Sequence, residues 1–295
     1  MIMSNKPFEI TSSFSTEEEI RSDYLVSKEM KQVWACEMDL LRKLLQVCDK
    51  YGLRCWADSG TLLGAVREGG FIPWDDDIDV SMFREDYDKL VSIADKEFNH
   101  PYFFQTIYSD KHYNHRHAQL RNSETAVLPP SGKPEKYNQG IFIDIFILDA
   151  YPKSAKQAYK FIRRLQWKKN LLKVCIKFCN LLPEWLYNRW RMDIKFFKSY
   201  EELLRETPIQ NTEYVSCLSW NIRAKIRLKS AYSATEYRLF EDMKIPIPAG
   251  YDSILRTDYG DYMKRVKAPT GHGILKYDTE RSYKEYQHKS LIVKR

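Results

Sequence analysis

Apolar residues recur every three to four positions between residues 30 and 48, which is the period of one buried face of an α-helix. Residues 15–18 read Ser-Thr-Glu-Glu, a capping box, so we expect this helix to begin at Ser15. Gly52 is the expected end of the helix. The residues on the apolar face are Met30, Val33, Trp34, Met38, Leu41, Leu44, Leu45 and Cys48.

Shorter apolar runs have the length of β-strands and alternate with helical segments. A short helix is expected at residues 61–63 and a longer one at about 84–97, with a loop over 67–73. This alternation predicts an α/β fold for the first half of the chain. The expected strands cover residues 53–57, 78–82, 102–108, 117–121 and 140–148.

After Pro152 the pattern becomes helical and basic, and the last third is rich in tyrosine. We therefore predict a loose tail over residues 1–14 and a catalytic core over 15–150. A mostly helical part over 151–295 is expected to complete the site.

Composition is that of an ordinary globular protein, with 43% apolar and 29% charged residues in 295. The net charge of +7 is unevenly placed, because residues 151–183 contain nine Lys or Arg and no Asp or Glu. This segment fits either a solvated helix face or an interfacial helix on an anionic membrane. Six cysteines without a CxxC pair, and no run of 18 apolar residues, favour a cytoplasmic protein, soluble or peripheral on the inner face of the membrane.

The most informative chemistry is the acidic run at residues 75–79. In a strand, alternate side chains share a face, so we expect Asp77 and Asp79 to point together, with Asp75 at the entrance. Asp76 should point elsewhere. A solvated acidic turn is the alternative, and an EF-hand fails on spacing because position six is Val80 rather than Gly.

Asp144 interrupts an apolar run, and together with the acidic run it suggests a metal site. A buried carboxylate is unfavourable unless a positive partner meets it. Because Mg²⁺ prefers oxygen ligands and leaves positions for substrate phosphates, a site made by Asp77, Asp79 and Asp144 would hold one or two Mg²⁺ ions, with Mn²⁺ as an alternative.

The small-residue turn at Ser59 and Gly60 lies between a predicted strand and a helix, where backbone N–H groups can receive a phosphate. Neither a P-loop nor a dinucleotide-binding GxGxxG motif follows a strand, so those nucleotide-binding folds are excluded.

Taken together, these motifs resemble the LicD family of the nucleotidyltransferase superfamily. The matching runs are DSGTLLGAVR at 58–67, GFIPWDDDIDV at 70–80, GIFIDIF at 140–146 with Asp149, and YGDYM at 259–263 followed by His272. The resemblance implies a mixed sheet flanked by helices, an α/β (α+β) fold. It also implies Asp77, Asp79 and Asp144 as metal ligands and Asp75 as a further catalytic carboxylate.

The resemblance further implies transfer of a phospho-alcohol, such as phosphocholine, from a CDP-linked donor to a hydroxyl of a cell-surface glycan, with release of CMP. The acceptor would be of the lipopolysaccharide or teichoic acid type, free or as a glycolipid. The fukutin-type ribitol-phosphate transferases are similar, but the absence of an N-terminal anchor pattern favours the bacterial branch. Gln119 stands where the family pattern has Lys, which leaves the transferred alcohol open.

Three cationic residues are candidates for phosphate binding: Arg67, Arg121 and His272. One alternative is transfer of the nucleotidyl group itself to a small or sugar acceptor. Another, from a different class, is a non-catalytic protein that binds a membrane or polyanion through residues 151–183. No nucleic acid is expected as a partner, because a single basic stretch without a recognised module is weak support.

Overall fold

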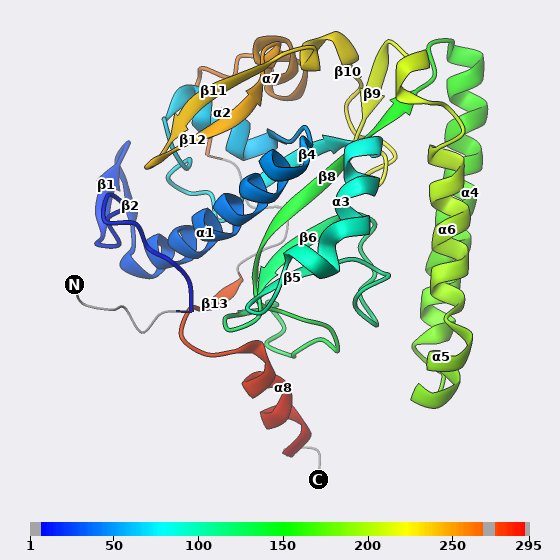
Figure 1. The fold of residues 1–295 in the computed structure, drawn as a ribbon, viewed down its shortest axis with the longest axis horizontal. Helices are drawn as coiled ribbons and strands as arrows, with labels where there is room; N and C mark the ends of the chain where they lie inside the picture. Colours follow the sequence, from blue (N-terminus) through cyan, green and yellow to red (C-terminus); the bar gives the residue numbers. More distant parts are fainter. Residues whose placement is uncertain (1–6, 268–274, 293–295) are drawn as a thin grey trace.

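The computed structural model describes residues 7–267 and 275–292 and is built around a mixed seven-stranded sheet (Figure 1). Its long central strand, β8 (Ile141–Tyr151), pairs in parallel with β4 (Asp79–Phe83) and antiparallel with two other strands. The expected mixed α/β fold is confirmed. The remaining strands of the sheet are β3 (Trp56–Ala57), β5 (Tyr102–Gln105), β6 (Ala118–Asn122), β9 (Tyr214–Ser216) and β10 (Arg227–Leu228).

Helix α1 (Lys28–Tyr51) lies across the sheet and buries the apolar face that its sequence predicts (Figure 1). The Ser27 side chain accepts a hydrogen bond from the backbone N–H of Met30, and Gly52 ends the helix with a left-handed φ of 62°. The predicted start at Ser15 is therefore wrong. The chain before the helix instead forms a hairpin of β1 (Glu19–Arg21) and β2 (Tyr24–Val26).

Two shorter helices flank the acidic run. Helix α3 (Arg84–Glu97) covers the predicted residues, whereas α2 (Ser59–Arg67) is longer than the short helix expected at 61–63. Between α2 and β4 the chain crosses as an irregular loop, residues 68–78, which we call the acid loop. This loop carries Asp75, Asp76 and Asp77 to the end of the sheet.

The basic segment forms α4 (Ala155–Cys179), which runs beside α6 (Met192–Leu204), with α5 (Glu184–Trp190) at the end of the pair (Figure 1). Leu165 on α4 packs with Tyr200 and Leu203 on α6 in a small core of their own. All six cysteines are buried and free. None of the helices described is long and apolar enough to span a bilayer.

The remaining part of the chain returns to the sheet, since β9 pairs with β8. Strands are therefore interspersed with the helices of residues 151–295, and the sheet continues across residue 150. At the other end, Phe8 and Phe14 are buried in the main core. The other strands and α-helices of the described chain are β7 (Ala126–Leu128), β11 (Thr235–Phe240), β12 (Met243–Pro248), α7 (Tyr251–Tyr259), β13 (Lys276–Asp278) and α8 (Tyr283–Ile292).

Candidate active site

Asp79 and Asp144 stand opposite each other on the neighbouring parallel strands β4 and β8. Both line a cavity of about 520 Å³, which also contains Asp77. The structure thus brings the distant acid at residue 144 to the acidic run, as the sequence predicts. The cavity is also lined by Gln119, Arg121 and Tyr137, so acids and a cation face the same space.

The acid loop is held in place by aromatic packing and by backbone hydrogen bonds. Trp34 on α1 stacks on Phe71 with ring centroids 4.5 Å apart, and its indole N–H donates to the carbonyl of Asp75 at 3.0 Å. On the other side, Glu241 accepts from the backbone N–H of Phe71 at 3.0 Å and pairs with Arg21. The position of the carboxylates is therefore fixed by segments far apart in the sequence.

The predicted strand register of the acids is wrong, because β4 begins at Asp79 and both Asp75 and Asp77 lie in the acid loop. Asp76 does turn elsewhere: its Oδ2 accepts a hydrogen bond from the Tyr277 hydroxyl at 2.9 Å. Asp75, Asp76 and Asp77 each offer an oxygen within 4.8 Å of the others. Among the residues described, no other trio of acids, His or Cys meets that limit. The oxygens of the predicted set Asp77, Asp79 and Asp144 are therefore more widely spaced than those of Asp75, Asp76 and Asp77.

The carboxylate of Asp144 has two polar partners on or beside β6 that sequence reasoning missed. The Nε2 atoms of His117 and Gln119 lie 3.0 Å and 2.8 Å from its Oδ1. Burial opposes ionisation, but His117 and Gln119 outweigh it and hold the pKa of Asp144 below its ordinary value. Burial and the neighbouring carboxylates of Asp77 and Asp144 raise the pKa of Asp79 well above its own.

The N-terminus of α2 is built around a buried ion pair. The carboxylate of Asp58 accepts from the backbone N–H of Ser59 at 2.6 Å and from Nη1 and Nη2 of Arg227, both at 2.8 Å. A Cβ on Gly60 would come within 2.3 Å of Asp75 Oδ2, so glycine is required for Asp75 to approach the helix. The turn predicted as a phosphate site thus also positions a carboxylate.

Arg121 lies in the cavity but is already engaged. Its guanidinium donates to the carbonyl of Gly140 at 2.6 Å and to the side-chain oxygens of Gln105 and Gln119. Gln119 therefore links Arg121 to Asp144.

Arg67 is directed into the protein rather than toward the cavity. Its Nε donates to Glu68 at 2.7 Å and its Nη1 to the carbonyl of Tyr262 at 2.8 Å, which ties the Tyr-Gly-Asp-Tyr motif to the end of α2. The structure gives Arg67 this positioning role, and its phosphate contact stays a prediction. His272 lies outside the described residues.

Glu37 is a further acid of the site that the sequence does not reveal, because it lies on the buried side of α1 among apolar residues. It is 1% exposed, and its Oε2 has no hydrogen-bond partner within residues 7–267 and 275–292. Burial and the nearby carboxylates of the acid loop raise its pKa well above the ordinary value.

The donor set suits a divalent cation of the Mg²⁺ type. All the groups are carboxylate oxygens, which hard cations prefer, and they meet at the edge of a cavity that is open to a substrate. The unpartnered Oε2 of Glu37 and the raised pKa of Asp79 both report uncompensated negative charge. A bound cation would remove that imbalance, with Asp77, Asp79 and Asp144 as the residues that would hold it.

Comparison with known proteins identifies a family for the segment that carries most of this site. Residues 52–172 match the family described as LicD/FKTN/FKRP, nucleotidyltransferase domain. The chain contains a LicD-family domain. The matched segment includes the N-terminus of α2, the acid loop, β4, β6 and β8, and most of the residues that line the cavity lie within it.

The relatives of this LicD-family domain include named transferases. The chain is 26% identical over 248 residues to the lipopolysaccharide cholinephosphotransferase LicD of Haemophilus influenzae, covering 77% of this chain and 88% of that protein. It is 44% identical over 45 residues to the ribitol 5-phosphate transferase FKRP of human and mouse, covering 15% of this chain and 9% of FKRP. An uncharacterised protein of Rickettsia prowazekii is 33% identical over 113 residues.

Proposed function

We propose that this protein transfers a phospho-alcohol, such as phosphocholine, from a CDP-linked donor to a hydroxyl of a cell-surface glycan, with the help of Mg²⁺. The observation that supports it best is the in-register pair Asp79 and Asp144 beside Asp77 in a domain of the LicD family. The relatives named above act on lipopolysaccharide or transfer ribitol 5-phosphate, which favours a glycan acceptor of the lipopolysaccharide or teichoic acid type.

In this reaction the acceptor hydroxyl attacks the phosphorus that carries the alcohol, and the bond from that phosphorus to the CMP oxygen breaks. The divalent ion would supply charge neutralisation on the diphosphate. We assign Asp75 to accept the hydroxyl proton, because its carboxylate lies beside Asp77 at the N-terminus of α2. His117 and Gln119 keep Asp144 ionised and oriented, since both contact its Oδ1.

The decisive experiment follows CMP release from a panel of CDP-alcohols with Mg²⁺ or Mn²⁺ and a glycan acceptor. We expect release with at least one CDP-alcohol, loss of release with EDTA, and an acceptor heavier by the phospho-alcohol. An acceptor that gains CMP instead would establish nucleotidyl transfer and overturn the proposal. No metal-dependent release from any donor would favour a non-catalytic binding protein.

We further propose that the protein is located at the inner face of the membrane as a peripheral protein. Four large apolar side chains around α5 are exposed, with exposed fractions from 44% to 83%, and Arg189 lies among them. An apolar tip with basic residues suits the surface of an anionic bilayer. We call this the helical tip; it consists of Phe178, Leu181, Trp185 and Trp190.

A further inference from the structure

A second cavity, of about 610 Å³, lies between α4 and the loop that precedes β6. We call it the α4 cleft. It shares His115, His117 and Trp220 with the cavity of the carboxylates, so these side chains form a common wall. A ligand held in the α4 cleft can therefore extend past this wall toward Asp144.

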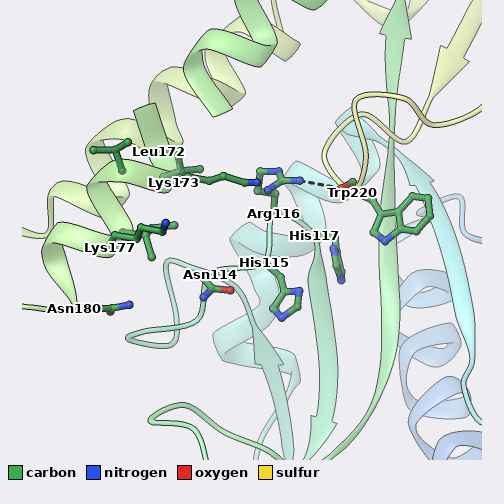
Figure 2. A pocket seen from close by; sticks show the side chains of 11 residues that line it. Asn114, His115, Arg116, His117, Leu172, Lys173, Lys177, Asn180 and Trp220 are labelled. Atoms are coloured by element: carbon green, nitrogen blue, oxygen red, sulfur yellow. Dashed lines mark hydrogen bonds between the residues drawn. The ribbon is translucent and has the colours of Figure 1, made fainter. Parts of the chain in front are cut away.

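The α4 cleft is cationic. Figure 2 shows Lys173 and Lys177 extending from α4 toward the loop that carries Arg116, and no carboxylate is among the lining residues. Arg116 donates to the carbonyls of Ser219 and Trp220 at 2.8 Å and 2.9 Å, so its guanidinium is held in position, and no carboxylate of the described residues pairs with it.

Among the described residues, the lysines of the α4 cleft differ from other cations of the basic segment in having no ion-pair partner. Lys153 and Arg164, elsewhere on the basic segment, pair with Glu213 and Glu206. Lys173 and Lys177, by contrast, form no ion pair with any residue that the structure describes. The pKa of Lys169, one turn before Lys173, is lowered by burial and then by neighbouring cations that include Arg116 and Lys173. Mutual repulsion in this group would be relieved by a bound anion.

Trp220 gives the α4 cleft a second recognition element. It is 51% exposed on the wall shared with the carboxylate cavity, beside Phe146. An exposed indole face suits the C–H face of a sugar ring. Anion-binding side chains at one end and an aromatic wall at the other match an acidic saccharide.

We propose that the α4 cleft binds the acceptor, and that this acceptor is an acidic saccharide whose phosphate or carboxylate lies against Arg116, Lys173 and Lys177. That the bound saccharide is the acceptor rests on the proposed function. That it is anionic rests on the lining of the α4 cleft alone. The donor diphosphate belongs to the other side of the shared wall, where the carboxylates would hold the cation.

The test measures binding without metal or donor, so that it does not depend on the transfer reaction. Line broadening in phosphorus NMR reports binding of glucose 6-phosphate to the full chain, with glucuronate and glucose as competitors. The variant is the double substitution Lys173→Gln and Lys177→Gln, both exposed. The matched control is Lys160→Gln, an exposed lysine of the same helix outside the α4 cleft.

We expect the wild-type chain and the Lys160→Gln variant to bind glucose 6-phosphate equally, with glucuronate competing and glucose competing poorly. The double variant should bind about tenfold more weakly, as expected for losing two solvent-exposed charge contacts. Equal binding by the double variant, or equal competition by glucose, would overturn the proposal. If no CDP-alcohol releases CMP, the proposed function fails, while this binding result still decides the α4 cleft.

A second arm separates a saccharide from a lipid headgroup. Sedimentation with vesicles of phosphatidylglycerol and phosphatidylcholine is measured for the same three proteins. Vesicle binding that the double substitution leaves unchanged supports a saccharide site. Loss of vesicle binding with retained binding of glucose 6-phosphate would assign the lysines to the membrane and contradict the inference.

Discussion

Asp77 and Asp76 are neighbours in the sequence with different surroundings: Asp77 lines the carboxylate cavity, whereas Asp76 is bonded to Tyr277. Asp77→Asn should therefore lower metal-dependent CMP release by at least about a hundredfold, since a catalytic cation contributes several kcal/mol. Asp76→Asn keeps an oxygen for the Tyr277 hydroxyl and should lose less than about tenfold. Equal losses in a steady-state assay would contradict this assignment.

Asp79 should show opposite effects on stability and on activity. Its buried carboxylate faces Asp77 and Asp144, so Asp79→Asn removes like-charge repulsion while keeping the side-chain shape. In EDTA we expect a gain of about 1 kcal/mol, or roughly 2–4 °C in melting temperature. Activity should be lost. A lower melting temperature in calorimetry would show that no such repulsion exists in the folded protein.

Gln119 and His117 are expected to act through Asp144. Partners that orient a metal ligand commonly contribute about 10–100-fold in affinity or activity. Gln119→Ala should therefore raise the Mg²⁺ concentration needed for half-maximal CMP release by about that factor. Gln166→Ala, on α4 and bonded to Asn170, is a matched control that should leave the Mg²⁺ dependence unchanged.

At the scale of elements, the strand β10 and the helix α2 are joined by the buried pair of Arg227 and Asp58. Arg227→Met leaves the Asp58 carboxylate buried without a cation, so we expect a loss of about 3–5 kcal/mol in urea unfolding. The exposed pair of Arg256 and Asp252 on α7 is the control, and Arg256→Met should cost less than about 1 kcal/mol. Similar losses from the two variants would argue against a structural role for the buried pair.

The buried pair of Arg227 and Asp58 also makes the stability of the protein depend on pH. Burial raises the pKa of Asp58, but Arg227 outweighs burial and the folded-state pKa lies below the ordinary value. The folded protein therefore binds this proton less readily than the unfolded chain. The stability that the pair contributes is present above the unfolded pKa and is lost as pH falls through the folded pKa. Arg227→Met should flatten that part of the acid unfolding curve.

For the whole molecule, the pair α4 and α6 extends beside the sheet and carries the helical tip at its end (Figure 1). The double substitution Leu181→Asn and Trp185→Asn should weaken sedimentation with anionic vesicles roughly tenfold, because two exposed apolar side chains no longer enter the bilayer. Leu239→Asn, an exposed apolar residue on β11, is the control and should have no effect. Unchanged vesicle binding in the tip variant would remove the helical tip from the proposal.

The apolar periods in the sequence were sufficient to predict α3, the buried face of α1 and the central strand β8. These features depend on residues close together in the chain, because the spacing of apolar residues is enough to indicate which face of a helix or strand is buried. The start of α1 was mispredicted because a capping box at residues 15–18 is a local signal. The hairpin of β1 and β2, which precedes the helix, involves tertiary contacts such as that of Arg21 with Glu241.

The acidic run and the interrupting Asp144 predicted one site made by Asp77, Asp79 and Asp144, since a lone acid in an apolar strand needs a partner. The pairing of β4 with β8 does place Asp79 opposite Asp144. The sequence by itself thus determined that Asp77, Asp79 and Asp144 converge on one cavity. Only the tertiary structure decided how they are held: Asp77 in a loop, Asp76 on Tyr277, Asp144 between His117 and Gln119. Contacts between residues many positions apart have no local period, so side-chain partners of this kind emerge only when the chain is folded.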